Sequence, residues 1–253
     1  MLEQFLEVNI WMLTVVMARI GTMLALVPGF GAGYVLPRYR LGIALAITFL
    51  LLPSLQAYIP PMPESVLALF LILTGEVIIG AFMASIGFFV ISALQAAGTF
   101  ISYFASMANA MIQDPISNQQ SSIISGFLST SALVAVFASD LHHVVLRAMV
   151  DSFSLFKPGM PIEFGDMSET LTLTLVKAFT LGLKLSSPML LVALVYYLAL
   201  GILGRLMPAL QVFFFGLPIQ VSLQIWVLMV CFSGMMIVFL RAYSEAYMPF
   251  LAP

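Results

Sequence analysis

The sequence predicts an all-α membrane protein with about six long hydrophobic helices, some of them kinked hairpins. Of its 253 residues, 62% are hydrophobic and only 8% are charged, whereas soluble domains carry roughly 25% charged residues. The hydrophobic residues form continuous runs of about the 20 residues that a membrane-spanning helix needs. They do not alternate within the ~10-residue segments typical of membrane β-barrels. A soluble fold and a β-barrel are therefore both disfavoured.

Charge and cysteine content narrow the possible partners. The formal net charge is −2, and the lysines and arginines are scattered, so no basic patch for nucleic acid or anionic lipid is expected. The one cysteine, Cys231, lies inside an apolar run and is expected to be a packing residue. No metal-ligand spacing surrounds it. We therefore predict a membrane protein with no cofactor, no resident metal and no nucleic-acid partner.

The apolar residues divide into six stretches joined by short loops. The third is about twice the length of a single span, and it forms either one long helix or a hairpin that turns near Gly87 or Gly98. In the fifth, Pro188 removes a backbone donor and predicts a kink. The chain is expected to be a single membrane domain with a non-standard topology. The six stretches cover residues 8–27, 41–59, 66–111, 123–150, 171–203 and 212–240.

A short polar insert interrupts the apolar sequence at residues 113–122. Between Val77 and Ser139 the chain carries one formal charge, that of Asp114. Irregular polar backbone beside hydrocarbon-length helices is tolerated only where protein buries it or water reaches it. The insert is therefore either a loop that leaves the membrane or a re-entrant element that lines a cavity. Asp114 also precedes Pro115, which is an ordinary signal for the start of a helix.

Glu76 is an isolated carboxylate in the third apolar stretch. A charged side chain alone in lipid would cost on the order of 3 kcal/mol. We expect Glu76 to face protein or to pair with a cation. It is then either a structural contact with another helix or subunit, or a carboxylate that couples ion movement to transport.

Small side chains recur every four residues at the end of the same stretch, at Gly98, Ser102 and Ser106. Such a stripe lets helices approach closely, within the chain or between chains. Met107 and Met111 share a neighbouring face. Because methionine is flexible and fills irregular gaps, this pair predicts either ordinary core packing or a deformable seal.

The titratable cluster near the fourth stretch contains Asp140, His142, His143 and Arg147. A proton relay or a metal site is one interpretation, since ionisable residues in membranes are often functional. Adjacent histidines on a helix point about 100° apart and share a metal poorly. The other interpretation is the end of a helix near the lipid interface, with local ion pairs.

The segment 201–219 resembles the signature of the FliR family of flagellar export-gate proteins, which includes the SctT/SpaR type of injectisome protein. That signature reads approximately Gly-x-x-x-Arg-x-x-Pro-Gln-x-Asn-Val-Phe, followed by Gly-x-Pro. Ala209 and Gln211 stand where the family has Gln and Asn. Pro28, Pro37, Arg40 and Pro53 also fall where family members place them, and the resemblance covers essentially the whole chain. The matching positions in the signature are Gly201, Arg205, Pro208, Val212, Phe213, Gly216 and Pro218.

The resemblance implies a non-enzymatic subunit of the flagellar type III export gate in the bacterial inner membrane, at the basal body. It implies FliP and FliQ as partners in a helical assembly, FlhB and FlhA nearby, and unfolded exported proteins as substrate. Residues 1–170 would correspond to a FliP-like part and residues 171–253 to a FliQ-like helical hairpin. The alternative is a secondary transporter with an intramembrane carboxylate.

The resemblance also implies a loop that closes the pore, at about residues 106–120. The candidate gate residues are Met107, Asn109, Met111, Gln113, Asp114 and Pro115. Together with the isolated carboxylate and the small-residue stripe, the family signature gives a second set, expected to make subunit or helix-packing contacts. This set comprises Glu76, Gly98, Ser102, Ser106, Arg205, Pro208, Gln211, Gly216 and Pro218.

Overall fold

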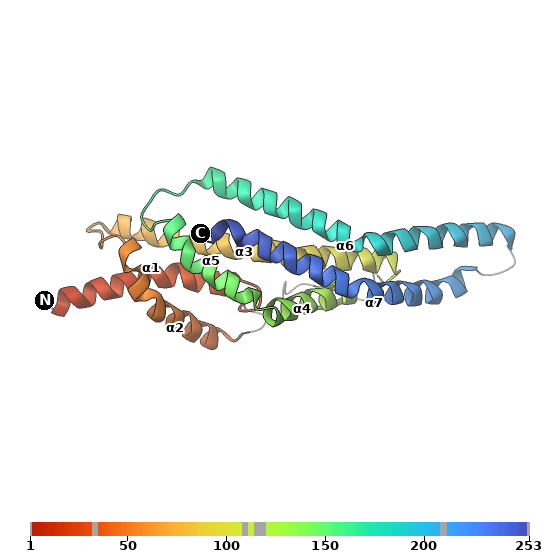
Figure 1. Ribbon diagram of the computed structural model, residues 1–253, viewed down its shortest axis with the longest axis horizontal. Coiled ribbons are helices and arrows are strands. Elements are labelled where there is room, and N and C mark those ends of the chain that lie inside the picture. Colours follow the sequence, from red (N-terminus) through yellow and green to blue (C-terminus); the bar gives the residue numbers. More distant parts are fainter. Residues whose placement is uncertain (1, 32–34, 108–110, 114–119, 208–211, 252–253) are drawn as a thin grey trace. The chain divides into compact units, whose positions relative to one another are not determined.

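The computed structural model describes residues 2–31, 35–107, 111–113, 120–207 and 212–251 (Figure 1). These residues are mainly α-helical, which confirms the predicted fold class. The helices are α1 (Leu2–Leu26), α2 (Pro37–Leu55), α3 (Val66–Phe104), α4 (Ile123–Ala138), α5 (Leu141–Leu155), α6 (Phe164–Leu206) and α7 (Val212–Tyr247). Two 3₁₀ turns, η1 (Gln56–Tyr58) and η2 (Met248–Phe250), and two short strands, β1 (Met111–Gln113) and β2 (Gln120–Ser122), complete the described elements.

Four described helices are long and apolar enough to cross a membrane, namely α2 with η1, α3, α6 and α7. This confirms the prediction of a multi-pass membrane protein. The fourth predicted stretch is not one helix, because the chain breaks at Asp140, whose φ is +57°. If α4 and α5 form one broken span, the described part holds five candidate spans. The apolar part of α1, Ile10–Leu26, is shorter than these candidate spans.

The overlong third stretch is one continuous helix, α3, of 39 residues. It turns at neither Gly87 nor Gly98, and both glycines instead allow close contacts. A Cβ added to Gly87 would lie 2.5 Å from the hydroxyl of Tyr247, and one added to Gly98 would lie 2.3 Å from the Cα of Ser125. These glycines therefore serve packing and do not mark a turn.

Helix α6 continues through Pro188. A proline inside a helix leaves the carbonyl four residues earlier without its usual donor, which here is the carbonyl of Lys184. The hydroxyl of Ser187 donates to that oxygen at 2.7 Å. The neighbouring serine thus replaces the missing backbone hydrogen bond.

The chain forms two compact units that share the long helices. The first comprises residues 1–89, 137–175 and 243–253. In this unit α2 packs back along α1 (Figure 1), and the indole of Trp11 donates to the carbonyl of Pro60 at 2.9 Å. The rings of Phe82 and Phe250 meet edge to face. The core of this unit therefore joins the N-terminal helices to the end of the chain.

The second unit comprises residues 90–136 and 176–242. It contains the C-terminal part of α3, both strands and most of α4. The antiparallel pair of α6 and α7 completes it (Figure 1). Phe100 packs edge to face on Phe179, and Phe127 packs on Phe232.

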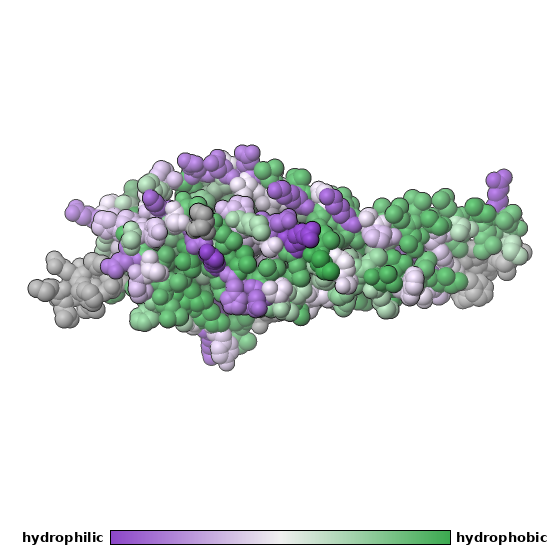
Figure 2. Space-filling view, in the orientation of Figure 1, coloured by the Kyte–Doolittle hydropathy of each residue, from purple (hydrophilic) through white to green (hydrophobic). Residues whose placement is uncertain are grey.

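Figure 2 shows hydrophobic side chains over much of the exterior of the α6–α7 pair. Leu191, Val195, Ile202, Trp226 and Met229 are all more than 60% exposed, as expected for a surface that meets lipid or another subunit.

Candidate functional site

The polar insert is a β-hairpin between α3 and α4. Strands β1 and β2 pair antiparallel, with Met111 opposite Ser122, Ile112 opposite Ser121 and Gln113 opposite Gln120. From the sequence, this insert is expected to be either a loop that leaves the membrane or a re-entrant element. The sequence does not predict strands. Of the predicted gate residues, Met111 and Gln113 lie at the two ends of strand β1, where their backbone is described. The predicted gate residues Asn109, Asp114 and Pro115 lie outside the described residues.

The first end of the hairpin is set by the C-terminus of α3. The amide of Met107 donates to the carbonyl of Ser102 at 2.8 Å, and that of Ser106 donates to the carbonyl of Tyr103 at 3.2 Å. Ser106 has a φ of +58°. These features make a Schellman motif, which normally places glycine at the left-handed position. The helix therefore ends sharply at a serine, and the half-buried Met107, a predicted gate residue, follows it.

The other end of the hairpin is set by the N-terminus of α4. The hydroxyl of Ser122 accepts a hydrogen bond from the amide of Ser125 at 3.1 Å. This is an N-cap, in which a side-chain oxygen satisfies an amide that the first turn leaves unpaired. The same hydroxyl lies 3.4 Å from the carbonyl of Gly98. The cap thus also ties the end of the hairpin to α3.

Gly98 and Ser102 lie where α3 meets α4. Both are buried, and a Cβ on Gly98 would lie 2.3 Å from the Cα of Ser125 and 2.7 Å from its amide nitrogen. The hydroxyl of Ser125 donates to the carbonyl of Gln95 at 2.9 Å. This part of the small-residue stripe therefore packs against a helix of the same chain, whereas Ser106 is exposed.

A second polar network, from α6 and α7, also holds the end of α3. The amide of Gln220, on α7, donates to the carbonyl of Phe104 at 2.6 Å and to the hydroxyl of Tyr197, on α6, at 2.7 Å. The hydroxyls of Tyr197 and Ser106 lie 3.4 Å apart. Gln220 is only 1% exposed. We call Ser106, Tyr197 and Gln220 the hairpin anchor.

Sequence reasoning missed two members of the hairpin anchor, Tyr197 and Gln220. The signal was available for Gln220, because an amide inside an apolar helix needs a hydrogen-bonding partner when it is buried. No comparable signal marks Tyr197, since tyrosine is common on apolar surfaces. Hydroxyl, amide and backbone groups make up the anchor. These groups suit the positioning of a backbone rather than proton transfer.

Glu76 pairs with Arg19. The Nε of Arg19 donates to Oε2 of Glu76 at 2.7 Å, and both side chains are at most 2% exposed. The remaining guanidinium nitrogens donate to the carbonyl oxygens of Ser152 and Phe156 at 2.9 and 2.7 Å. The carbon of the guanidinium lies 4.0 Å from the ring centroid of Phe153. Glu76 is thus part of a contact that ties α1, α3 and the end of α5 together.

The residues of the family signature lie at the turn between α6 and α7. Arg205 is exposed in the last turn of α6, where a cation complements the helix dipole. Gly216 is buried, and its carbonyl accepts a hydrogen bond from the hydroxyl of Tyr196 at 2.5 Å. Pro218 lies inside α7 and is exposed. The predicted contact residues Pro208 and Gln211 lie outside the described residues.

Comparison with known proteins identifies the family. The profile of the family described as bacterial export proteins, family 1, matches residues 10–246. The flagellar biosynthetic protein FliR of Caulobacter vibrioides is 32% identical over 94% of each chain, and FliR of Bacillus subtilis is 28% identical over 90% of this chain and 89% of its own. The secretion system apparatus protein SsaT of Salmonella typhimurium is 26% identical over 89% of each chain. The chain therefore belongs to bacterial export proteins, family 1, the FliR family.

Proposed function

We propose that this protein is a structural subunit of the bacterial flagellar type III protein export gate, which forms and closes the secretion pore with FliP and FliQ subunits. Relatives that match nearly the whole chain are named flagellar biosynthetic proteins, which supports a role in the flagellar rather than the injectisome export system. In this proposal the protein lies in the inner membrane at the basal body, with FlhB and FlhA nearby. Residues 1–170 form its FliP-like part and residues 171–253 its FliQ-like hairpin.

The observation that carries the proposal is the β1–β2 hairpin, a polar element held at both ends by apolar helices. The Schellman motif at Ser106 and the N-cap at Ser122 define where it starts and ends. We propose that the hairpin and its flanks close the pore, with Met107, Asn109, Met111, Gln113, Asp114 and Pro115 as the gate residues. The short uncharged side chains at positions 117–122 would hydrate a passing unfolded chain without binding either sign of charge.

The protein carries out no reaction in this proposal. Its role is mechanical, because the hairpin anchor positions a backbone, and the buried Arg19–Glu76 pair ties helices together. The energy for transport would come from partner proteins. The exposed apolar faces of α6 and α7 supply surface for lipid and for neighbouring subunits.

Deletion of the hairpin tests the proposal. Because Met111 lies opposite Ser122, a four-residue Gly/Ser linker in place of residues 111–121 can connect the helices and keep the cap on α4. We expect assembled gates with this change to leak small solutes, measured as dye entry into cells. A Gly-Ser-Gly-Ser replacement of the exposed loop 61–64 is the control. Unchanged permeability in complexes that assemble normally would contradict the gate assignment.

The alternative function, a secondary transporter, depends on an intramembrane carboxylate. Glu76 is poorly placed for this role, because Arg19 occupies it at 2.7 Å and neither side chain meets solvent. Asp140 is exposed. If Glu76 coupled ions, Glu76→Gln would abolish export while the protein level stayed normal. We expect export to follow the protein level instead.

A further inference from the structure

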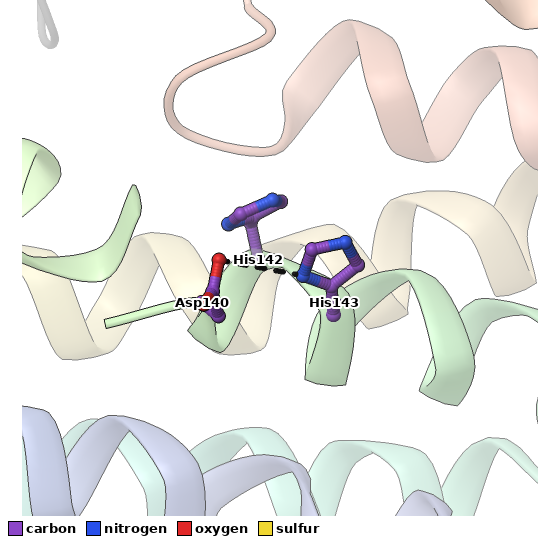
Figure 3. Close-up of side chains that lie close together, drawn as sticks. All are labelled: Asp140, His142 and His143. Carbon is purple, nitrogen blue, oxygen red and sulfur yellow. Dashed lines mark ion pairs between the residues drawn. The ribbon is translucent and has the colours of Figure 1, made fainter. Parts of the chain in front are cut away.

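Three side chains of metal-ligating type converge at the start of α5. Asp140, His142 and His143 each offer one ligand atom, and these atoms all lie within 4.8 Å of one another. Figure 3 shows the Asp140 and His143 side chains facing each other, with the ring of His142 beside them. We propose that these residues form a binding site for a divalent transition-metal ion, with Zn²⁺ as its reference ligand. This proposal does not rest on the proposed function.

Asp140 has a left-handed backbone, and its side chain caps no amide of α5, which leaves the carboxylate available to a ligand. Its Oδ1 lies 3.8 Å from Nδ1 of His143, which is too long for a hydrogen bond. Two ligands on one tetrahedral Zn²⁺ lie about 3.3 Å apart, given bonds of about 2.0–2.1 Å. A small side-chain movement therefore brings both atoms onto one ion.

His142 lies closer to His143 than their adjacent positions on a helix predict. The two ring centroids are 4.1 Å apart. His142 also stacks on Phe137, with centroids 5.0 Å apart and planes 25° apart, and this stacking holds the ring beside Asp140. Its Nδ1 is buried and has no hydrogen-bond partner among the described residues. Because buried polar atoms are normally paired, this nitrogen is a second observation that indicates a ligand.

The donor set selects the class of ion. Two imidazoles and one carboxylate suit zinc, nickel or copper rather than magnesium or calcium, which prefer oxygen ligands. Three protein ligands leave a fourth tetrahedral position open for water or for a group from another molecule.

The neighbouring charges are compatible with a bound cation. The cation one turn along, Arg147, lies 3.7 Å from Asp151 and is directed to that carboxylate. The positive end of the α5 dipole opposes a cation, and the carboxylate of Asp140 offsets it. A bound ion would fix the first turn of α5 to the residue before it.

The test uses the full-length chain in detergent, purified with a tag that contains no histidine. We expect calorimetric titration to give one equivalent of bound Zn²⁺. Each of three single changes, Asp140→Asn, His142→Asn and His143→Asn, should weaken Zn²⁺ binding by at least about tenfold. Losing a side chain that only hydrogen-bonds to a metal ligand commonly has an effect of that size, and these residues are the ligands themselves. Asp166→Asn, an exposed carboxylate in the first turn of α6, is the matched control and should bind normally.

A second readout separates this site from adventitious binding. Co²⁺ in the site should give visible absorption typical of mixed nitrogen and oxygen ligands. Zn²⁺ should also raise the melting temperature of the wild type but not of the three variants. The site is disproved if the wild type binds no Zn²⁺, or if all three variants, with normal metal-free melting temperatures, bind it like the wild type.

Discussion

Arg19 and Glu76 form a buried ion pair, with Nε and Oε2 2.7 Å apart and neither side chain in contact with solvent. The residues are 57 positions apart and lie on α1 and α3. Because Arg19 also donates to the carbonyls of Ser152 and Phe156 at the end of α5, one guanidinium on α1 satisfies groups on α3 and α5 and so joins three helices. Gly80 allows this approach, since a Cβ there would lie 2.5 Å from the carbonyl oxygen of Arg19.

Removing one member of the pair should be strongly destabilising. Glu76→Met and Arg19→Met each leave one buried charge without its partner, and breaking a buried pair typically costs about 3–5 kcal/mol. The double variant Arg19→Met with Glu76→Met should lose less than the sum of the two single changes. The measurement is the melting temperature in detergent together with the protein level in membranes.

The control for this pair is Arg147, whose side chain is 69% exposed and lies 3.7 Å from Asp151. Exposed pairs contribute about 1 kcal/mol or less, so Arg147→Met should change the melting temperature little. Additive losses in the double variant would show that Arg19 and Glu76 act independently and would contradict the coupling.

Gly98→Ala should disrupt the contact between α3 and α4. The added Cβ would lie 2.3 Å from the Cα of Ser125, and backbone cannot move aside as a flexible side chain can. Overpacking typically costs about 1–3 kcal/mol. Gly201→Ala, which meets nothing within 4 Å, is the matched control, and should be neutral or stabilising by up to about 1 kcal/mol. Equal protein levels for both variants would contradict the close packing.

Ser106→Gly should stabilise the end of α3. Its left-handed backbone costs a non-glycine residue roughly 1–2 kcal/mol, and glycine removes that cost. The 3.4 Å contact with Tyr197 is lost, but it is too long to offset the gain. Ser106→Val should destabilise the protein instead. Melting temperatures in the order Gly, Ser, Val from highest to lowest are expected, and any other order would contradict the strain.

The fold class was predictable because long apolar runs have few alternatives to helix in a membrane. The breaks were less predictable. At Asp140 the chain adopts a left-handed conformation that hydropathy does not encode, so one predicted stretch became α4 and α5. At Gly87 and Gly98 the glycines suggested a turn, but they allow close packing, and only the neighbouring residues Tyr247 and Ser125 distinguish these two roles.

The candidate site was predictable as a location but not as a structure. The scarcity of charge around the insert marked the hairpin, and the serine at position 122 is an ordinary cap residue. The pairing of β1 with β2 rests on only three residue pairs, too short for a pattern to predict. Glu76 required a partner on electrostatic grounds, but Arg19 is 57 residues away, and its choice depends on the packing of α1 against α3.

The hairpin anchor predicts unequal roles for two buried glutamines of α7. Gln220 donates to the carbonyl of Phe104 and to Tyr197, whereas Gln224 donates only to the carbonyl of Met189 at 3.1 Å, and its Oε1 has no partner among the described residues. Gln220→Met leaves a carbonyl at the end of α3 without its donor, which should cost about 1–3 kcal/mol. Gln224→Met should cost less, because it also removes a buried unpaired oxygen.

The same pair of variants tests whether the hairpin anchor affects the proposed closure of the pore. Gln220→Met loosens the helix end from which the hairpin begins, so assembled gates should admit dye, and Tyr197→Phe should do so more weakly because the bond to Phe104 stays. Gln224→Met lies one turn further along α7 and should leave permeability unchanged. If both glutamine variants lose stability equally and neither leaks, Gln220 is a packing residue and the hairpin is held by α3 and α4 alone.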